Sequence, residues 1–153
     1  MFQILIPLCL LANGLTAGGL LVSVVGVAPV RLALPADRAV QLHQLLLPRL
    51  EPLMPALLAA GAVLNGVAGF SAPTTATHVL CIVASSLQLK AVLVAVTKNA
   101  PINRRLAALD ADALPADFAE TDPRETWRKW NTVRAVLVIA SLAVNAVIVG
   151  LLL

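Results

Sequence analysis

Four long runs of apolar residues, separated by shorter polar stretches, dominate the pattern along the chain. They span residues 4–30, 53–70, 76–97 and about 130–152. A helix needs roughly 20 apolar residues to cross the hydrocarbon core of a bilayer. The pattern therefore predicts an all-α protein, a four-helix transmembrane bundle that forms a single integral membrane domain over residues 1–153.

Capping residues and prolines indicate where the later helices begin. Thr74 or Thr75 can cap the third span. Residues 122–125 read Asp-Pro-Arg-Glu, which supplies an N-cap, a proline at the first helical position and a glutamate three residues after the cap. Residues 101–109 are amphipathic and predict a short cytoplasmic helix on the membrane surface between spans three and four. The first run has no basic segment before it, so we expect span one to be retained rather than cleaved as a signal peptide.

Charged residues are scarce and unevenly placed. Of the 153 residues, 59% are apolar and 12% are charged, and the net charge is +3. The basic residues concentrate around the connections at 31–52 and 98–126 and at the start of span four, where they flank the spans and do not indicate nucleic-acid binding. The positive-inside rule therefore predicts both long connections in the cytoplasm and both termini outside.

Cysteine and histidine do not form a recognisable metal-binding pattern. Cys9 and Cys81 lie inside apolar runs without C-x-x-C spacing, which argues against a thiol-redox or thiolate metal centre. In the predicted topology, His43 and His78 lie on opposite sides of the membrane, roughly 30 Å apart along a helix of about 20 residues. They cannot share one metal, and His43 is the better candidate for a general base because other polar residues lie at its level.

The start of the fourth helix carries a polar and aromatic face. Trp127, Trp130, Asn131 and Arg134 are spaced i, i+3, i+4 and i+7, so they share one side of the helix. Such a face can hold a planar, partly polar ligand by stacking and hydrogen bonding. The alternative is an interface anchor, because Trp and Arg are favoured at the depth of the lipid headgroups.

Three further polar residues are candidates near the third span. Asn99 and Asn103 follow its end, where they could contribute to a site, terminate the helix or lie in solvent. Lys90 is the single charge inside a span, and such charges are costly and often functional. We expect its amine to face the bundle interior, with snorkelling to the headgroups as the alternative. Its expected partners are Asn13, Asn65 and Asn145.

Three segments resemble a known family. They are LHQLLLPRLEPLMPAL at 42–57, NAPINRRL at 99–106 and WRKWNTVR at 127–134. Together they are similar to the anthrone oxygenase-like family of small four-span membrane proteins. The family pattern maps here onto His43, Asn99, Pro101, Asn103, Trp127, Asn131 and Arg134.

The resemblance implies an activity: molecular oxygen converts an anthrone to an anthraquinone, with no cofactor expected and no metal ligands assigned. A base would remove an acidic ring proton, and hydrogen-bond donors would hold the oxyanion. His43 would be the base, and the two indoles would enclose the rings. The implied oxyanion donors are Arg134, Asn131, Asn99 and Asn103, and the implied substrate-binding residues are Trp127, Trp130 and Lys90.

Two other functions remain open on the sequence. One is a non-enzymatic membrane protein that binds a lipid or a small hydrophobic molecule. The other is a metal- or haem-dependent membrane oxidase, for which the sequence supplies few ligands at one level. The expected partners are the lipid bilayer and a small hydrophobic aromatic substrate, and a homo-oligomer is compatible with the sequence.

Overall fold

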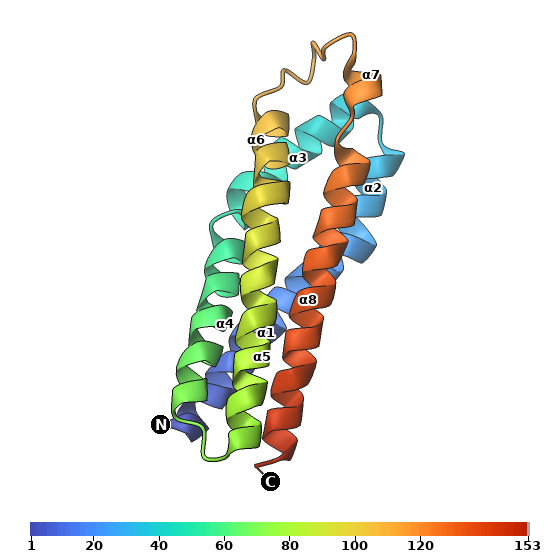
Figure 1. Ribbon diagram of the computed structural model, residues 1–153. Coiled ribbons are helices and arrows are strands. Elements are labelled where there is room, and N and C mark those ends of the chain that lie inside the picture. The colour runs from blue at the N-terminus through green and yellow to red at the C-terminus, as the bar shows by residue number, and fades with distance from the viewer. Residues whose placement is uncertain (153) are drawn as a thin grey trace.

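The computed structural model describes residues 1–152, and within that range it is helical, with loops but no strand. The helices form one elongated bundle in which both termini lie at the same end (Figure 1). The elements are α1 Phe2–Val22, η1 Ser23–Val27, α2 Ala28–Ala33, α3 Ala36–Leu50, α4 Leu53–Phe70, α5 Thr75–Val94, η2 Ala95–Asn99, α6 Ala100–Ala107, α7 Phe118–Thr121 and α8 Arg124–Gly150. The predicted all-α bundle is confirmed.

Four stretches are long and apolar enough to cross a membrane: Phe2–Ala33, Leu53–Phe70, Thr75–Ala107 and Phe118–Gly150. Their outer faces carry large apolar side chains that are more than half exposed in the isolated chain, among them Leu11, Val63, Leu93 and Val136. Apolar side chains in contact with lipid explain this exposure, which would be unusual for a water-soluble bundle. The protein is therefore a multi-pass membrane protein.

The first and third spans each contain one π-helical segment. In the first span, η1 joins α1 to α2, and in the third, η2 joins α5 to α6 without a break in the helix. A π-helical turn holds an extra residue, so it changes which side chains of the following helix face inward. The predicted amphipathic helix at 101–109 corresponds to α6, which continues the third span instead of forming a separate element.

The end of the bundle opposite the termini is closed by a small cap, which we define as α3, α6 and residues 108–121. Val40, Leu106 and Phe118 form its buried centre. The side-chain amide of Gln44 donates to the carbonyl of Leu109 at 2.8 Å, which ties α3 to the residues after α6. The cap therefore holds α3, and with it His43, against the membrane-spanning helices.

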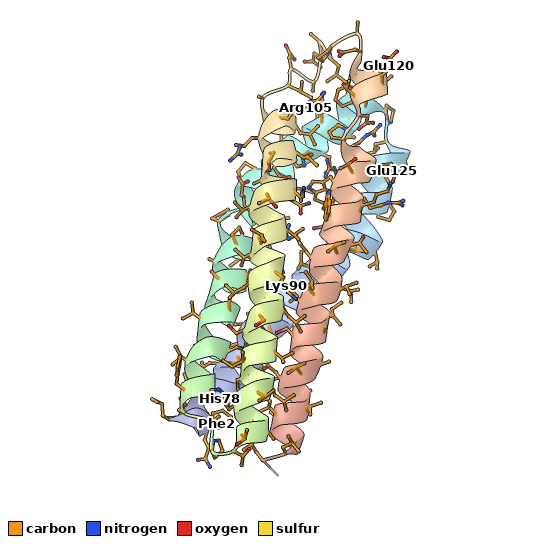
Figure 2. The ribbon with its side chains drawn as sticks, viewed as in Figure 1. Phe2, His78, Lys90, Arg105, Glu120 and Glu125 are labelled. Atoms are coloured by element: carbon orange, nitrogen blue, oxygen red, sulfur yellow. The ribbon has the colours of Figure 1, made fainter. Side chains whose placement is uncertain are left out.

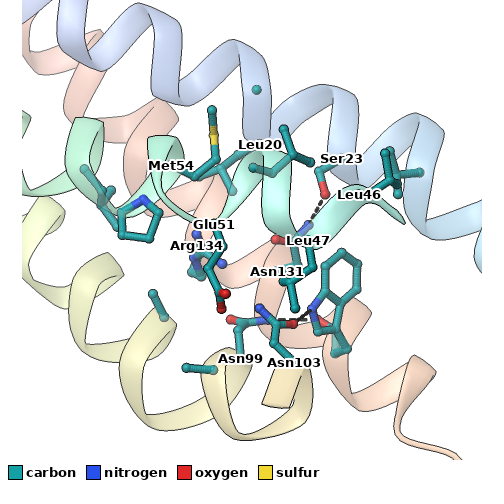
Figure 3. A pocket seen from close by; sticks show the side chains of 18 of the residues that line it. Leu20, Ser23, Leu46, Leu47, Glu51, Met54, Asn99, Asn103, Asn131 and Arg134 are labelled. Atoms are coloured by element: carbon teal, nitrogen blue, oxygen red, sulfur yellow. Dashed lines mark hydrogen bonds between the residues drawn. The ribbon is translucent and has the colours of Figure 1, made fainter. Parts of the chain in front are cut away.

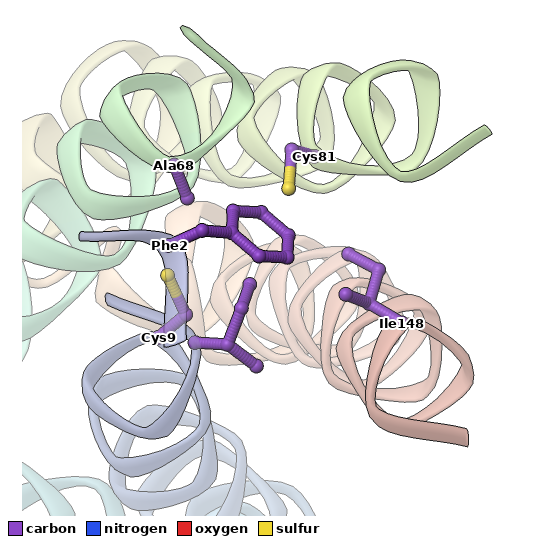
Figure 4. Close-up of a cluster of buried hydrophobic side chains, with 6 residues drawn as sticks. Phe2, Cys9, Ala68, Cys81 and Ile148 are labelled. Atoms are coloured by element: carbon purple, nitrogen blue, oxygen red, sulfur yellow. The ribbon is translucent and has the colours of Figure 1, made fainter. Parts of the chain in front are cut away.

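The end that carries the termini is packed with apolar side chains. Phe2, Cys9, Ala68, Cys81 and Ile148 gather there from four spans (Figure 4). Both cysteines are buried as free thiols. This end of the bundle is thus an apolar core, and the buried charged side chains lie toward the cap.

Helix starts agree with the capping residues to within one position. Thr74 caps α5, and its side chain and that of Thr77 bond each other's backbone N–H in a capping box. The last helix begins at Arg124 with Pro123 as its N-cap, one residue later than predicted. Asp122 still serves that start, because its Oδ1 accepts from the backbone N–H of Arg124 at 3.0 Å. A shift of one residue is common at helix boundaries, because the ends of helices fray.

Candidate functional site

A cavity of about 210 Å³ lies where the spans meet the cap (Figure 3). All four spans and α3 contribute to its wall, which is mostly apolar. A cavity of about 150 Å³ can hold benzene in another protein, so this one has room for an aromatic ligand. Six of the residues singled out in the sequence line it: His43, Asn99, Asn103, Trp127, Asn131 and Arg134.

Trp127 is the centre of the contacts in this cavity. Its indole Nε1 donates to Asn103 Oδ1 at 2.9 Å. The edge of one ring meets the face of the other between Trp127 and His43, with centroids 6.5 Å apart and an interplanar angle of 87°. The guanidinium carbon of Arg31 lies 4.4 Å from the centre of the indole ring. Three helices thus fix the position of one aromatic ring.

The two remaining amides are held by one bond each. Asn99 Nδ2 donates to the carbonyl of Trp127 at 3.4 Å, and its Oδ1 is buried without a partner within residues 1–152. Asn131 Nδ2 donates to the hydroxyl of Ser23 at 3.0 Å (Figure 3). Ser23 and Asn99 both belong to π-helical segments, which are often found at functional sites. The altered helical register therefore helps to bring these two polar side chains to the cavity.

His43 presents a free nitrogen to this environment. Its side chain is 4% exposed, and Nε2 has no hydrogen-bond partner among the described residues. Burial, and then the nearby positive charge of Arg31, lower the pKa of His43 to about 4. The imidazole is therefore neutral near pH 7 and able to accept a proton.

Two guanidinium groups share the cavity with these polar groups. Arg134 is 8% exposed, and its Nε lacks a partner among residues 1–152. Arg31 is 2% exposed, and all three of its side-chain nitrogens are buried without a partner in the same range. The arrangement combines a neutral imidazole, amides and two cations around an apolar space. It can bind a planar ligand that carries negative charge on oxygen.

Sequence reasoning missed Arg31, which resembled the other basic residues that flank the spans. A signal was available in the spacing. Ser23, Val27 and Arg31 recur every four residues, and all three line the cavity. Residues spaced by four lie on one face of a helix, so this spacing places Arg31 on the same inward face of the first span as Ser23.

Two predicted site residues lie elsewhere. Trp130 is not among the residues that line the cavity. It makes a cation–π contact with Lys98, whose amine lies 5.2 Å from the centre of the Trp130 ring. Lys90 is exposed and lies about half-way along the third span, so the expectation that it faces the bundle interior is wrong (Figure 2). Gln88 takes the inward position instead, fully buried, because two residues correspond to about 200° of rotation around a helix.

The two histidines lie at opposite ends of the bundle. His78 is near the termini, where its Nδ1 is 2.7 Å from the carbonyl oxygen of Gly69 (Figure 2). Within residues 1–152, no three side chains of His, Cys, Asp or Glu lie close enough together to hold a metal ion. The chemistry that the cavity residues themselves offer is acid–base and electrostatic.

Comparison with known families gives one match. The family model described as anthrone oxygenase matches residues 44–144, which is about two-thirds of the chain. No curated protein and no solved structure matches. The matched range contains five of the six cavity residues above and begins directly after His43. Arg31 also lies before it.

Proposed function

The chain belongs to the anthrone oxygenase family, and on this premise we propose that it oxidises a hydrophobic, anthrone-type aromatic substrate with molecular oxygen in the cavity beneath the cap. The family supports an oxygenase-like role in general. One observation carries the proposal to this site: buried His43, whose Nε2 has no hydrogen-bond partner within residues 1–152, lies in the wall of the same cavity as Arg134. A base and a cation on one small apolar space match the needs of the reaction.

The first step is proton removal. The Nε2 of His43 takes a proton from the methylene carbon of the anthrone, and the electron pair of the broken C–H bond moves into the ring system as an aryl oxyanion. Arg134, Asn99, Asn103 and Asn131 are the groups proposed to stabilise that oxyanion. Trp127 provides a flat surface beside the rings. The bound oxyanion would also raise the pKa of His43, against the effect of burial, and so favour the protonated imidazole once the proton has been taken up.

The second step consumes oxygen. The electron-rich carbon forms a C–O bond with molecular oxygen, and the resulting peroxide anion takes the proton from the imidazolium. Loss of the second methylene proton then breaks the O–O bond and gives the second carbonyl group and hydroxide, which leaves as water. One anthrone and one molecule of oxygen thus give one anthraquinone and one molecule of water, with no external reductant.

The substrate reaches the cavity from the bilayer in this proposal. An anthrone is apolar and planar, so it dissolves in lipid and can enter between spans without crossing water. The basic side chains concentrate at the cap end, which the positive-inside rule assigns to the cytoplasm. We therefore propose that the cavity lies at the cytoplasmic boundary of the membrane, with both termini outside.

The test is turnover by protein purified in an uncharged detergent. Anthrone is added in air-saturated buffer, and oxygen consumption and anthraquinone absorbance are followed together, with one oxygen expected per anthraquinone. His43→Gln is expected to lower turnover by about 100-fold or more, as for loss of a general base. His78→Gln, at the other end of the bundle, is the matched control and should retain turnover.

Two results would point to the alternatives. Turnover that disappears on treatment with a metal chelator, or that tracks a haem absorption band, would favour the cofactor-dependent oxidase. Saturable binding of anthrone by the folded protein without any oxygen consumption would favour the non-enzymatic binding protein.

A further inference from the structure

Arg31 is a buried charge for which residues 1–152 supply no counter-ion within ion-pair distance. Its three side-chain nitrogens have no hydrogen-bond partner within residues 1–152, and the residue is 2% exposed. A buried cation without a partner is strongly unfavourable, so such a group normally marks the place of a ligand or a missing partner. The unbonded N–H groups of Arg31 therefore call for an anion.

The nearby acidic groups are already engaged or do not reach it. Asp122 forms an ion pair with Arg124, with 2.6 Å between Arg124 Nη2 and Asp122 Oδ2. Arg124 in turn donates from Nη1 to the backbone carbonyl of Arg31 at 2.8 Å, which adds a second positive charge close by. Glu51 also lines the cavity, yet no ion pair joins it to either cavity arginine in the described part of the chain. Arg31, Arg124 and Asp122 together therefore carry one net positive charge.

Arg31 is also held in a fixed place in the cavity wall. Its guanidinium carbon lies over the Trp127 ring, 4.4 Å from the ring centre, at a distance typical of a cation–π contact. A cation–π contact does not satisfy the N–H groups of the guanidinium, and all three of these nitrogens lack a hydrogen-bond partner within residues 1–152. Several unsatisfied N–H donors on one planar group suit the two oxygens of a carboxylate better than a single neutral oxygen.

The second cavity arginine lies at a different level. Trp127 and Arg134 are seven residues apart on α8, about 10 Å along the helix axis. Arg31, whose guanidinium lies over Trp127, and Arg134 therefore address different parts of a ligand. One cation suffices for the oxyanion that develops during the proposed reaction, and the other is available for a charge that the ligand carries permanently.

We propose that the aromatic ligand of this cavity bears a carboxylate group that pairs with Arg31. The proposal rests on the proposed function for the identity of the ring system, and on the contacts of Arg31 for the anion. Arg31 precedes residue 44, so the family match does not include it. The acidic group would distinguish the substrate of this chain from a neutral anthrone.

The two tryptophans and the lack of tyrosine allow a direct binding test. In a Trp130→Phe background, Trp127 is the one remaining indole, and it lines the cavity beside Arg31. The probes are an anthraquinone carboxylate and methylanthraquinone, which have the same rings and differ in charge. Quenching of Trp127 fluorescence in uncharged detergent gives the affinity for each.

The expected result is a charge preference that depends on Arg31. Arg31→Met should weaken carboxylate binding by about tenfold or more, as for loss of a charge-assisted pair, and leave methylanthraquinone binding within about threefold. Because each probe partitions equally into the micelles of every sample, the comparison between variants is not affected by detergent. Arg38→Met, which removes an exposed arginine of α3, is the matched control and should leave both affinities unchanged.

Three results would overturn the proposal. One is equal weakening of both probes by Arg31→Met. Another is an absence of Trp127 quenching by the carboxylate in the protein with Arg31 intact. This measurement does not depend on whether an Arg31 variant folds. The third is recovery of the quenched Trp127 fluorescence by short-chain phosphatidylglycerol at concentrations below that of the bound carboxylate probe, since a lipid phosphate would then be the preferred anion.

Anthrone turnover, measured on the same samples, separates this inference from the proposed function. Turnover that requires His43, with no charge preference, would reject the carboxylate and leave the oxygenase proposal standing. A charge preference that requires Arg31, without turnover of any anthrone, would retain the anion site and reject the reaction.

Discussion

The protein buries polar side chains in two regions that differ in how these groups are used. The first is the cavity beneath the cap, and the second is a polar layer in the middle of the bundle. The layer consists of Asn13, Thr16, Asn65, Gln88, Ser141 and Asn145, all of them 0% exposed. Its members are uncharged, whereas the cavity contains two arginines and a histidine.

Two members of the polar layer, Asn13 and Ser141, join helices to one another. Asn13 Nδ2 donates to Ser141 Oγ at 3.1 Å, and that hydroxyl donates to the carbonyl of Ala84 at 3.0 Å, so one chain of bonds links three spans. Gly61 allows a fourth span, α4, to approach Asn13 and Gln88 closely. A Cβ at position 61 would lie only 2.6 Å from Asn13 Oδ1 and 2.7 Å from Gln88 Nε2. Helices in lipid gain stability from such bonds and from small residues at their contacts. Polar residues inside a membrane bundle thus indicate a ligand-binding site where they surround a cavity. Where they are tightly packed, they indicate a contact between helices.

Arg134→Ala should give the largest separation between the two regions. Loss of a guanidinium that stabilises an oxyanion is expected to lower turnover by about 100-fold, or close to 3 kcal/mol. Ser141→Ala, two turns further along α8 in the polar layer, should lower thermal stability and leave turnover per folded molecule near that of the parent. The comparison fails if both variants lose turnover in proportion to the folded fraction, measured by size-exclusion chromatography.

Acidification should destabilise the cavity region selectively. The pKa of His43 is about 4 in the folded protein and about 6.5 in an unfolded chain, so between these values the unfolded state binds the proton more readily. Stability is therefore lost as pH falls below about 6.5, by roughly 2 kcal/mol between pH 7 and pH 5. Thermal unfolding of the parent and of His43→Gln at both pH values measures it. An equal loss in both proteins would show that His43 does not contribute.

Gly61→Ala is a test of the polar layer alone. The added methyl group must displace the ends of Asn13 and Gln88, and we expect a loss of about 1 to 2 kcal/mol in stability with turnover per folded molecule retained. Gly18→Ala is the matched control, since nothing within residues 1–152 lies within 4 Å of a Cβ at that position. Melting temperatures that are lowered equally by the two substitutions would contradict the tight packing assigned to Gly61.

The smallest effect is expected at the bond that orients Trp127. Asn103→Ala removes the acceptor for the indole N–H, worth about 1 kcal/mol. In the Trp130→Phe background, the emission of Trp127 should shift and broaden, and turnover should fall severalfold. An unchanged spectrum would mean that this bond does not fix the ring.

The spans and several site residues could be predicted from the sequence because they depend on local patterns. Apolar runs set the positions of the helices, and Thr74 supplies its capping oxygen to residues three positions away. The shared face of Trp127, Asn131 and Arg134 follows from helical spacing, and all three line the cavity. Such features require no knowledge of how the helices pack.

Tertiary packing decided what the sequence pattern could not. Lys90 was expected inside because it is charged, but the inward face of α5 is set by its contacts with α4 and α8, and it carries Gln88. In the sequence, Arg31 looks like any other cation that flanks a membrane span. Its place in the cavity depends on packing, which brings the Trp127 ring of α8 beside it. The π-helical segments have no simple sequence signature, since their extra residue is accommodated by neighbouring helices.

The π-helical segments η1 and η2 also divide two of the spans into halves with different rotational phase. A single-residue deletion in η2 would restore a regular α-helix and turn everything beyond it by about 100°. The residues before η2 would keep their packing, while Asn99 and Asn103 would move off the cavity wall together. Gain or loss of one residue in these segments is therefore a route by which a chain of this kind could exchange its entire ligand-facing set without rebuilding the half of the bundle that holds it in the membrane.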